Sequence, residues 1–346
     1  MKIAERILDG IKTALIDGEA TIDLKSIDEA SAITGSGSNV GGRTYFEDAF
    51  AVARYANPFR MGARQVSISG SDMQFVVKTG NAASATNPFG YTIDPNSGSP
   101  NINTGFWQLP VRVISAQLPI RSAVLSDVNA LEAEIVEDLI FEFSQIEASS
   151  MAVNDDQSGS TTTTNGAESG LRGLTSYNTS TTVASFGTSG TAITNGVHTV
   201  LTVEASVTAP TYDTIANIAS SLPAQYWAMP TTAWHIHPTL IATLRKLKGA
   251  TGGQPMFVEV GDEDSAAVGY MFGFPVIPNP YLDAPAVGAI PLILANWDRF
   301  LTIGDTETMT IKRFDQTQVG FVTILAEMRM VSSIRDVFAG VFLKGI

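Results

Sequence analysis

Residues 126–155 read SDVNALEAEIVEDLIFEFSQIEASSMAVND. Apolar side chains recur along this stretch at steps of three and four residues, which is the spacing of one face of an amphipathic helix. Ser126 and Asp127 precede the first of them, and an acidic residue there suits the positive end of the helix dipole. The stretch therefore predicts a long helix with an apolar face made of Val128, Leu131, Ile135, Leu139, Phe143 and Ile146.

The other face of this predicted helix is acidic and consists of Glu132, Glu134, Glu137, Asp138, Glu142 and Glu147. Because no Lys or Arg occurs between Ser122 and Leu171, no ion pair can form within the helix. Carboxylates that act as a catalytic pair need burial that separates their pKa values. A solvated acidic face is therefore the favoured interpretation, and a carboxylate-dependent hydrolase is kept as an alternative.

Two stretches upstream of the helix alternate apolar and polar residues as β-strands do, Arg64 to Lys78 and Trp107 to Val113. Together they predict a long hairpin. The segment between them contains Asn87-Pro88 and Asp94-Pro95, which is turn chemistry spread over too many residues for a tight turn. This segment is either a surface loop or a functional loop that becomes ordered on a neighbouring molecule.

The N-terminal residues predict an arm. Ile3, Ile7, Ile11 and Leu15 recur every four residues, which is typical of an amphipathic helix. A Gly/Ser stretch from Thr34 to Gly42 follows and predicts a flexible connection to the rest of the chain. An apolar helix face on a flexible connection needs another surface to pack against.

The second half of the chain predicts short strands and two more helices. A segment rich in Ser, Thr, Gly and Asn, residues 157–196, precedes it as a low-complexity insert. Helices are expected at Tyr212 to Leu222 and at Pro238 to Lys248. Because the strands and helices do not alternate as βαβ units, the predicted class is α+β. The strands are expected at residues 233–236, 270–277, 290–295, 300–303, 309–311, 321–325 and 337–343.

The composition limits the classes of protein to which the chain can belong. Only 16% of its 346 residues are charged, where about 25% is typical, so we expect much of the surface to be buried against partners. The net charge of -13 disfavours direct binding to a nucleic-acid backbone. The absence of cysteine excludes disulfides, thiolate metal sites and a cysteine nucleophile. No secretion signal and no membrane span are expected, which also disfavours a surface adhesin.

Two motifs could carry chemistry, and both favour a structural role. His235 and His237 lie on one face of a predicted strand and could share a metal, but no third ligand is spaced nearby. Gly35, Gly37 and Gly41 miss the dinucleotide-binding spacing by one residue. We therefore expect no catalytic, cofactor-binding or metal-binding residue.

The order of these parts resembles one family, the major capsid proteins of tailed phages, whose fold is named after phage Hong Kong 97. Each resembling stretch is short and apolar, so the likeness rests on their order and spacing. The stretches are the 64–115 hairpin with the acidic helix and Gly170-Leu171-Arg172-Gly173-Leu174, then Ala233 to Lys248, Gly273-Phe274-Pro275-Val276, and Ile324 to Arg329 with Val337 to Lys344.

The resemblance implies a Hong Kong 97-type major capsid fold of four parts. These are an N-terminal arm (1–60), an extended β-hairpin loop or E-loop (61–118), a peripheral domain with a long spine helix (119–200 and 305–346), and an axial domain (201–304). It also implies that the arm and the extended loop reach neighbouring copies. The inter-subunit contact candidates are Ile3, Ile7, Ile11, Leu15, Phe89, Tyr91, Asp94, Pro95 and Trp107.

The implied function is that of a non-enzymatic major capsid protein that self-assembles into hexamers and pentamers of an icosahedral shell around a viral double-stranded DNA genome. The implied partners are other copies, a scaffolding, portal or decoration protein, and packaged DNA without sequence-specific contact. The implied location is the virion, after assembly in the host cytoplasm. A cellular, encapsulin-type nanocompartment shell of the same fold is the nearest alternative.

The chain departs from some members of this family in two places. Members that cross-link their shells covalently carry a lysine near a proline of the extended loop. This chain has Asp94-Pro95 at the similar place, and Lys78 is its only lysine between Lys25 and Lys246. We therefore expect no covalent cross-link between copies. No long charged segment precedes the first predicted helix, so we also expect no proteolytic removal of an N-terminal segment.

Overall fold

The structure is a computed structural model that describes residues 57–81, 102–121, 131–156, 169–182, 196–248, 255, 257–259, 267–306, 310–318 and 321–346. The chain divides into two units, Met1–Val52 and Ala53–Ile346, and every described element belongs to the second. The predicted N-terminal helix lies outside the described residues, as do the tip of the extended loop and most of the 157–196 insert.

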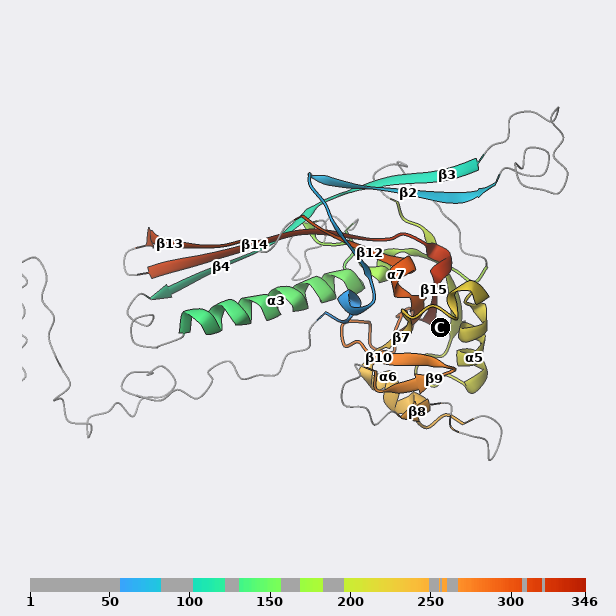
Figure 1. Cartoon of the computed structure of the whole chain (residues 1–346). Coiled ribbons are helices and arrows are strands. Elements are labelled where there is room, and N and C mark those ends of the chain that lie inside the picture. The colour runs from blue at the N-terminus through green and yellow to red at the C-terminus, as the bar shows by residue number, and fades with distance from the viewer. Residues whose placement is uncertain are drawn as a thin grey trace, which may run out of the picture. The chain divides into compact units, whose positions relative to one another are not determined.

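A five-stranded sheet is built around one long strand, β14 (Phe321–Ile334). Strands β4, β12 and β13 pair antiparallel with β14, and β1 pairs parallel with β12 (Figure 1). This sheet joins segments from the two ends of the described chain. The bounds of the other strands are Arg64–Ser67 for β1, Arg112–Arg121 for β4, Leu301–Asp305 for β12 and Thr310–Gln318 for β13.

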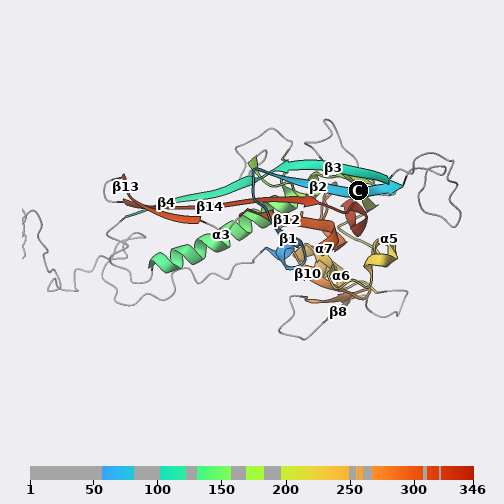
Figure 2. The ribbon, with the colours of Figure 1, turned by 45° about the horizontal axis from the view of Figure 1, so that its top comes forward.

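Helix α3 (Leu131–Val153) confirms the long predicted helix, although its predicted start at Ser126 lies outside the described residues. Its Phe143 is buried against Ile324 and Ala326 of β14. The helix runs beside strands β4 and β14 in both views of the ribbon (Figures 1 and 2). One face of α3 is therefore fixed on the sheet by apolar burial.

An eight-stranded sheet holds most of the hydrophobic core, with its strands in the order β5-β6-β15-β11-β7-β10-β9-β8. All residues of its central strands β7 (Thr232–Ile236) and β11 (Leu292–Asn296) are buried, which explains why neither strand alternates apolar with exposed polar residues. The other strands are Asn178–Ser180 (β5), Thr199–Ala205 (β6), Phe257–Glu259 (β8), Gly269–Met271 (β9), Phe274–Pro278 (β10) and Gly340–Gly345 (β15).

Short helices connect these strands. Helix α5 begins after Thr211, whose side chain accepts a hydrogen bond from the backbone nitrogen of Thr214. Asn296 caps α7 in the same way. The helices are α5 (Tyr212–Ser221), α6 (Pro238–Leu244) and α7 (Trp297–Phe300), with 3-10 turns η2 (Pro58–Met61), η5 (Leu174–Ser176), η6 (Ala224–Tyr226) and η7 (Val337–Ala339).

The predicted hairpin exists but is shorter than expected. Strands β2 (Asp72–Asn81) and β3 (Ile102–Pro110) pair with each other in a sheet of their own. The prediction was wrong in adding residues 64–67, which form β1, and Val113, which lies in β4. The break falls at Gly70, whose φ of 143° interrupts the strand and lets the chain change sheets.

Other predicted elements differ in length. Residues 270–277 form two strands, because Phe272 (φ 50°) and Gly273 (φ 84°) make a tight turn between β9 and β10. The helix from Pro238 ends at Leu244 instead of Lys248. The strands predicted at 309–311 and 321–325 extend to Gln318 and Ile334 as β13 and β14. The 337–343 segment begins as the turn η7 and becomes a strand at Gly340.

Sheet membership does not follow the predicted domain boundaries at every point. Strand β15, predicted in the peripheral domain, pairs with β6 and β11 in the eight-stranded sheet. Strand β1, predicted in the extended loop, pairs with β12. The division into arm, extended loop, peripheral domain and axial domain remains a prediction.

Candidate subunit-contact surfaces

Most of the predicted contact residues lie outside the described part of the chain, namely Ile3, Ile7, Ile11, Leu15, Phe89, Tyr91, Asp94 and Pro95. Trp107 is described, and its side chain is only 1% exposed. It faces the interior of its own chain, so we assign it to the core instead of to an inter-subunit contact. The described residues nevertheless show how the extended hairpin and the spine helix are held in place.

The base of the hairpin is fixed by an aromatic stack. Phe75 of β2 lies directly opposite Trp107 of β3, and the two rings are parallel with centroids 5.2 Å apart. His198 meets the Trp107 ring edge-on at 4.4 Å. Gly196 approaches so closely that a Cβ there would lie 2.5 Å from the Trp107 ring. Only glycine fits this position, because its φ of 43° is also left-handed.

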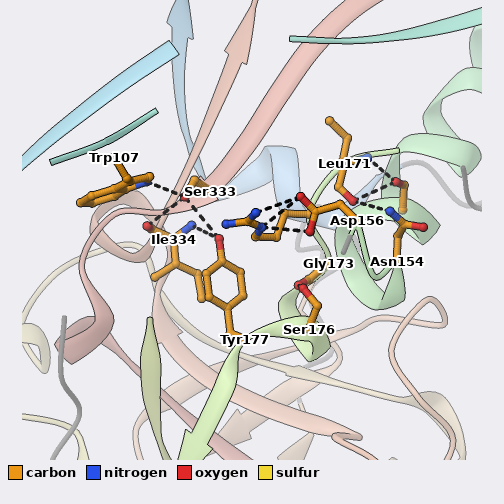
Figure 3. A network of polar contacts seen from close by, with 11 residues as sticks. Trp107, Asn154, Asp156, Leu171, Gly173, Ser176, Tyr177, Ser333 and Ile334 are labelled. Carbon is orange, nitrogen blue, oxygen red and sulfur yellow. Dashed lines mark hydrogen bonds and ion pairs between the residues drawn. The ribbon is translucent and has the colours of Figure 1, made fainter. Parts of the chain in front are cut away.

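A chain of hydrogen bonds connects this stack to β14 (Figure 3). Trp107 Nε1 donates to Ser333 Oγ at 3.1 Å, and Ser333 Oγ donates to the carbonyl of Ile334 at 3.2 Å. The Tyr177 hydroxyl therefore donates to Ser333 Oγ at 3.2 Å and accepts from the Ile334 backbone nitrogen at 3.0 Å. Burial raises the pKa of Tyr177, so the hydroxyl keeps its proton. The Ser333 and Tyr177 hydroxyls each donate one hydrogen bond and accept at least one, so the polar groups of this chain are satisfied and the hairpin base has a single defined position.

The segment after α3 is fixed to the C-terminal end of that helix. The side-chain amide of Asn154 donates to the carbonyl of Leu171 at 2.7 Å, and the Leu171 nitrogen donates to Ser150 Oγ at 2.8 Å (Figure 3). Gly173 donates its backbone N–H to the Asn154 carbonyl at 2.9 Å. A Cβ at Gly173 would lie 2.5 Å from the Asn154 nitrogen, so this close contact requires glycine. The Gly-Leu step noted in the sequence thus has a packing reason.

A buried ion pair lies next to this turn. Arg172 contacts Asp156 through Nε at 3.1 Å and through its terminal nitrogen at 3.0 Å, and their side chains are 1% and 7% exposed. The guanidinium also lies 5.9 Å from the centre of the Tyr177 ring. Burial alone would lower the pKa of Arg172, but Tyr177 and Asp156 raise it above its ordinary value. The pair thus connects the end of the spine helix to the residue that anchors the hairpin.

A second charged group ties the spine helix to the five-stranded sheet. Arg60 in η2 donates from Nε to the Glu147 carboxylate of α3 at 2.7 Å. Its two terminal nitrogens donate to the two carboxylate oxygens of Asp305 in β12 at 2.8 and 2.9 Å. These residues line a groove of about 810 Å³ that also contains apolar Ile140 and Met328. The Ile140 side chain is 49% exposed, so the mouth of the groove is open.

Glu147 is expected to make stability depend on pH. Burial raises its pKa from 4.5 to about 7, while Arg60 opposes the shift. Because the folded state holds this proton more tightly than the unfolded chain, the contribution of Glu147 to stability is full below pH 4.5 and falls as the pH rises through 7. The loss amounts to about 3 kcal/mol at most. Glu147→Gln should remove that part of the pH dependence.

Chemical unfolding of the full chain at pH 5 and pH 8 measures this effect. The variant should be relatively more stable, compared with the native chain, at pH 8 than at pH 5. Glu204→Gln, at an exposed position of β6, is the matched control for replacing a carboxylate by an amide. An equal difference between Glu147→Gln and the native chain at both pH values would contradict the assignment.

The two histidines have structural roles. His237 caps α6, where its Nδ1 accepts from the backbone nitrogen of Thr239. His235 is buried between Phe59 and Trp297, and its Nδ1 lies 3.3 Å from the side-chain nitrogen of Asn279. Burial lowers the pKa of His235 to about 3, so its ring is neutral. Within the described ranges, no group of three or more His, Cys, Asp or Glu side chains is placed to hold a metal.

Apolar side chains are also exposed on the described part of the molecule. Among the residues with described structure, no helix has the length and hydropathy needed to cross a membrane. Exposed apolar side chains lie both on helix α3, where Ile140 is 49% exposed, and on strands, with Val76 of β2 66% exposed and Val113 of β4 50% exposed. Single exposed apolar residues are normal on a protein surface, so these positions alone do not define a contact surface.

A family model described as the phage capsid family matches residues 49–345. The chain belongs to the phage capsid family. It is similar to the capsid of a native GTA particle, with a TM-score of 0.69 and 16% identity over 92% of this chain and 99% of that one. It is also similar to Microbacterium phage Oxtober96, with a TM-score of 0.53 and 13% identity over 94% of this chain and 100% of that one. No curated protein matches.

A third similar structure is the mature capsid of bacteriophage PhiM1, with a TM-score of 0.53 and 10% identity over 89% of this chain and 92% of that one. These likenesses confirm the predicted α+β capsid fold. Membership of the phage capsid family makes the chain a major capsid protein, a structural subunit that associates with its own copies to form the shell of the virion. The comparisons favour neither an encapsulin-type nanocompartment nor a carboxylate-dependent hydrolase.

Proposed function

We propose that this major capsid protein forms hexamers and pentamers of an icosahedral shell that encloses double-stranded DNA without sequence-specific contact. The observation that supports this proposal is that the hairpin and the spine helix are both firmly attached to the body of the subunit. Trp107, Tyr177 and Arg60 hold both elements on the body of the subunit. A subunit that presents such rigid, partly apolar elements gains binding strength from several neighbours at once.

Negative-stain electron microscopy of the protein expressed alone and concentrated tests the proposal. Closed shells, or rings of five and six subunits, would support it. A monodisperse monomer that also fails to assemble with co-expressed scaffolding candidates would contradict it.

We propose further that the protein has no enzymatic activity and assembles in the host cytoplasm with the help of a scaffolding, portal or decoration protein. The net charge of -13 supports an inner wall to which the packaged genome does not adhere. The predicted N-terminal arm would then contact other copies through Ile3, Ile7, Ile11 and Leu15. The predicted extended loop would contact them through Phe89, Tyr91, Asp94 and Pro95.

Assembled shells are expected to contain no covalent links between copies. The extended loop carries Asp94-Pro95 where cross-linking members carry a lysine, and Lys78 is the only lysine between residues 25 and 246. Intact shells boiled in denaturant should therefore run as monomers of 36.7 kDa on a gel. A ladder of higher species that survives boiling and reduction would overturn this prediction.

A further inference from the structure

Three arginines gather near the base of the hairpin without an equal number of carboxylates. Arg64 begins β1, Arg299 lies in α7, and Arg335 follows β14. Arg335 is fixed by its backbone nitrogen, which donates to the Phe300 carbonyl at 2.7 Å. Arg64 and Arg335 line a cleft of about 440 Å³ together with Val76, the exposed apolar residue of β2. We call Arg64, Arg299 and Arg335 the arginine cluster.

The charge of the cluster is poorly compensated. Among the described residues, its one ion pair joins Arg299 to Asp298 at 3.9 Å, and both side chains are 49% exposed, so the pair is weak. Asp336, the other nearby acid, accepts from the Tyr226 hydroxyl at 2.6 Å and from the Phe338 nitrogen at 3.1 Å. Burial is the main cause that lowers the pKa of Arg335, and the positive charges of Arg64 and Arg299 lower it further.

Each copy also carries the opposite charge in excess. Helix α3, Leu131–Val153, contains six acidic residues and no basic one, and the chain as a whole has 34 acidic against 21 basic residues. Within its own chain, the buried Glu147 of this helix pairs with Arg60 and not with the arginine cluster. The chain therefore offers both halves of a contact between different surfaces of two copies.

We propose that the arginine cluster binds carboxylate side chains of a second copy, and that the acidic helix α3 of that copy supplies them. Guanidinium groups bind carboxylates through paired hydrogen bonds, and an open cleft beside exposed Val76 leaves room for a helix to approach. Phosphates of packaged DNA are the other possible anions. They are disfavoured because three arginines on a chain of net charge -13 make a small basic footprint.

The inference rests on the proposed shell function and is tested by removing the charge. Arg64→Gln combined with Arg335→Gln should raise the concentration needed for assembly about tenfold or more and should weaken its dependence on salt. Lys246→Gln with Lys248→Gln is the control, because it removes two exposed positive charges outside the cleft. Assembly of the full chain without nucleic acid is followed by light scattering and sedimentation at several salt concentrations.

A cross-linking experiment identifies the partner. Arg64→Lys and Arg335→Lys place an amine in the cleft, and a carbodiimide joins that amine to a neighbouring carboxylate. The expected product is an amide between the introduced lysine and a 131–153 peptide, formed in assembled shells and absent from unassembled protein. Cross-links to another peptide, or to Asp298 or Asp336 regardless of assembly, would overturn the inference.

The outcomes separate the inference from the shell function. If the native chain forms shells and the double glutamine variant assembles identically, the inference is wrong and the shell function stands. If that variant forms normal empty shells and only loses packaged DNA, the cluster binds phosphate instead and the inference is wrong. If the native chain does not form shells under any condition, both the inference and the proposed shell function are wrong.

Discussion

Trp107→Ala is expected to free the extended hairpin from the subunit and to abolish closed shells. The substitution empties a site that is 1% exposed, ends the 5.2 Å stack on Phe75, and deprives Ser333 Oγ of a donor. Removing a buried aromatic side chain of this size costs about 3–5 kcal/mol. Because the same side chain mounts the hairpin on β14, the loss should affect assembly more than the fold of the eight-stranded sheet.

Chemical unfolding and electron microscopy measure the two effects. Trp107→Phe should be intermediate, because it keeps the stack but loses the Nε1 hydrogen bond, for a cost of about 1–2 kcal/mol. Trp227→Ala is the matched control, since its side chain is 48% exposed and donates to the nearby Leu222 carbonyl. Normal shells from Trp107→Ala, with stability equal to that of Trp227→Ala, would show that this side chain does not mount the hairpin.

The sequence predicted best those elements whose signal is local. The spacing of apolar residues in α3 and the short strand predicted at 233–236 both depend on neighbouring residues, and both elements were confirmed. The alternation in β2 and β3 also placed Phe75 and Trp107 on matching strands. These patterns report which face of an element is buried, and they need no knowledge of the partner.

Partners far apart in the sequence could not be predicted in this way. The two alternating stretches on either side of Ser69–Asp72 were read as one strand although the alternation changes phase there, and neither stretch shows that β1 pairs with β12 while β2 pairs with β3. Strand β14 was predicted short because Glu327 and Arg329 interrupt its apolar pattern on the outer face of the sheet. Pairing is chosen by tertiary packing, which single-strand patterns do not contain.

The ion pairs of Arg60 could not be predicted from the sequence for the same reason. Arg60 is 87 residues from Glu147 and 245 residues from Asp305, so no motif links them. Trp107 was predicted to contact another subunit because the family resemblance places it in the extended loop, which is implied to reach neighbouring copies. It lies near the hairpin base, where β3 packs on β14, and its position opposite Phe75 was the one available signal of an internal stack.

Asp156→Leu should be the second strongly destabilising change, because it leaves the Arg172 guanidinium buried without its carboxylate. Arg172 is only 1% exposed, so water cannot replace the lost partner. Breaking such a pair from one side costs about 3–5 kcal/mol. The same turn leads to Tyr177, which holds Ser333 and Ile334, so the variant should also loosen the hairpin base and form fewer closed shells.

The double variant Asp156→Leu with Arg172→Met shows whether the destabilisation of Asp156→Leu comes from the buried charge of Arg172 or from the loss of the pair's hydrogen bonds. Replacing both ions by apolar side chains removes both buried charges, and such exchanges are often neutral or stabilising. Methionine can also follow the path of the arginine stem beside the Tyr177 ring, at the place where the guanidinium now lies 5.9 Å from the ring centre. Chemical unfolding should therefore show the double variant within about 1 kcal/mol of the native chain. If the double variant is as unstable as Asp156→Leu alone, the turn depends on the directed hydrogen bonds of the pair, and the destabilisation does not come from a buried guanidinium that has lost its carboxylate.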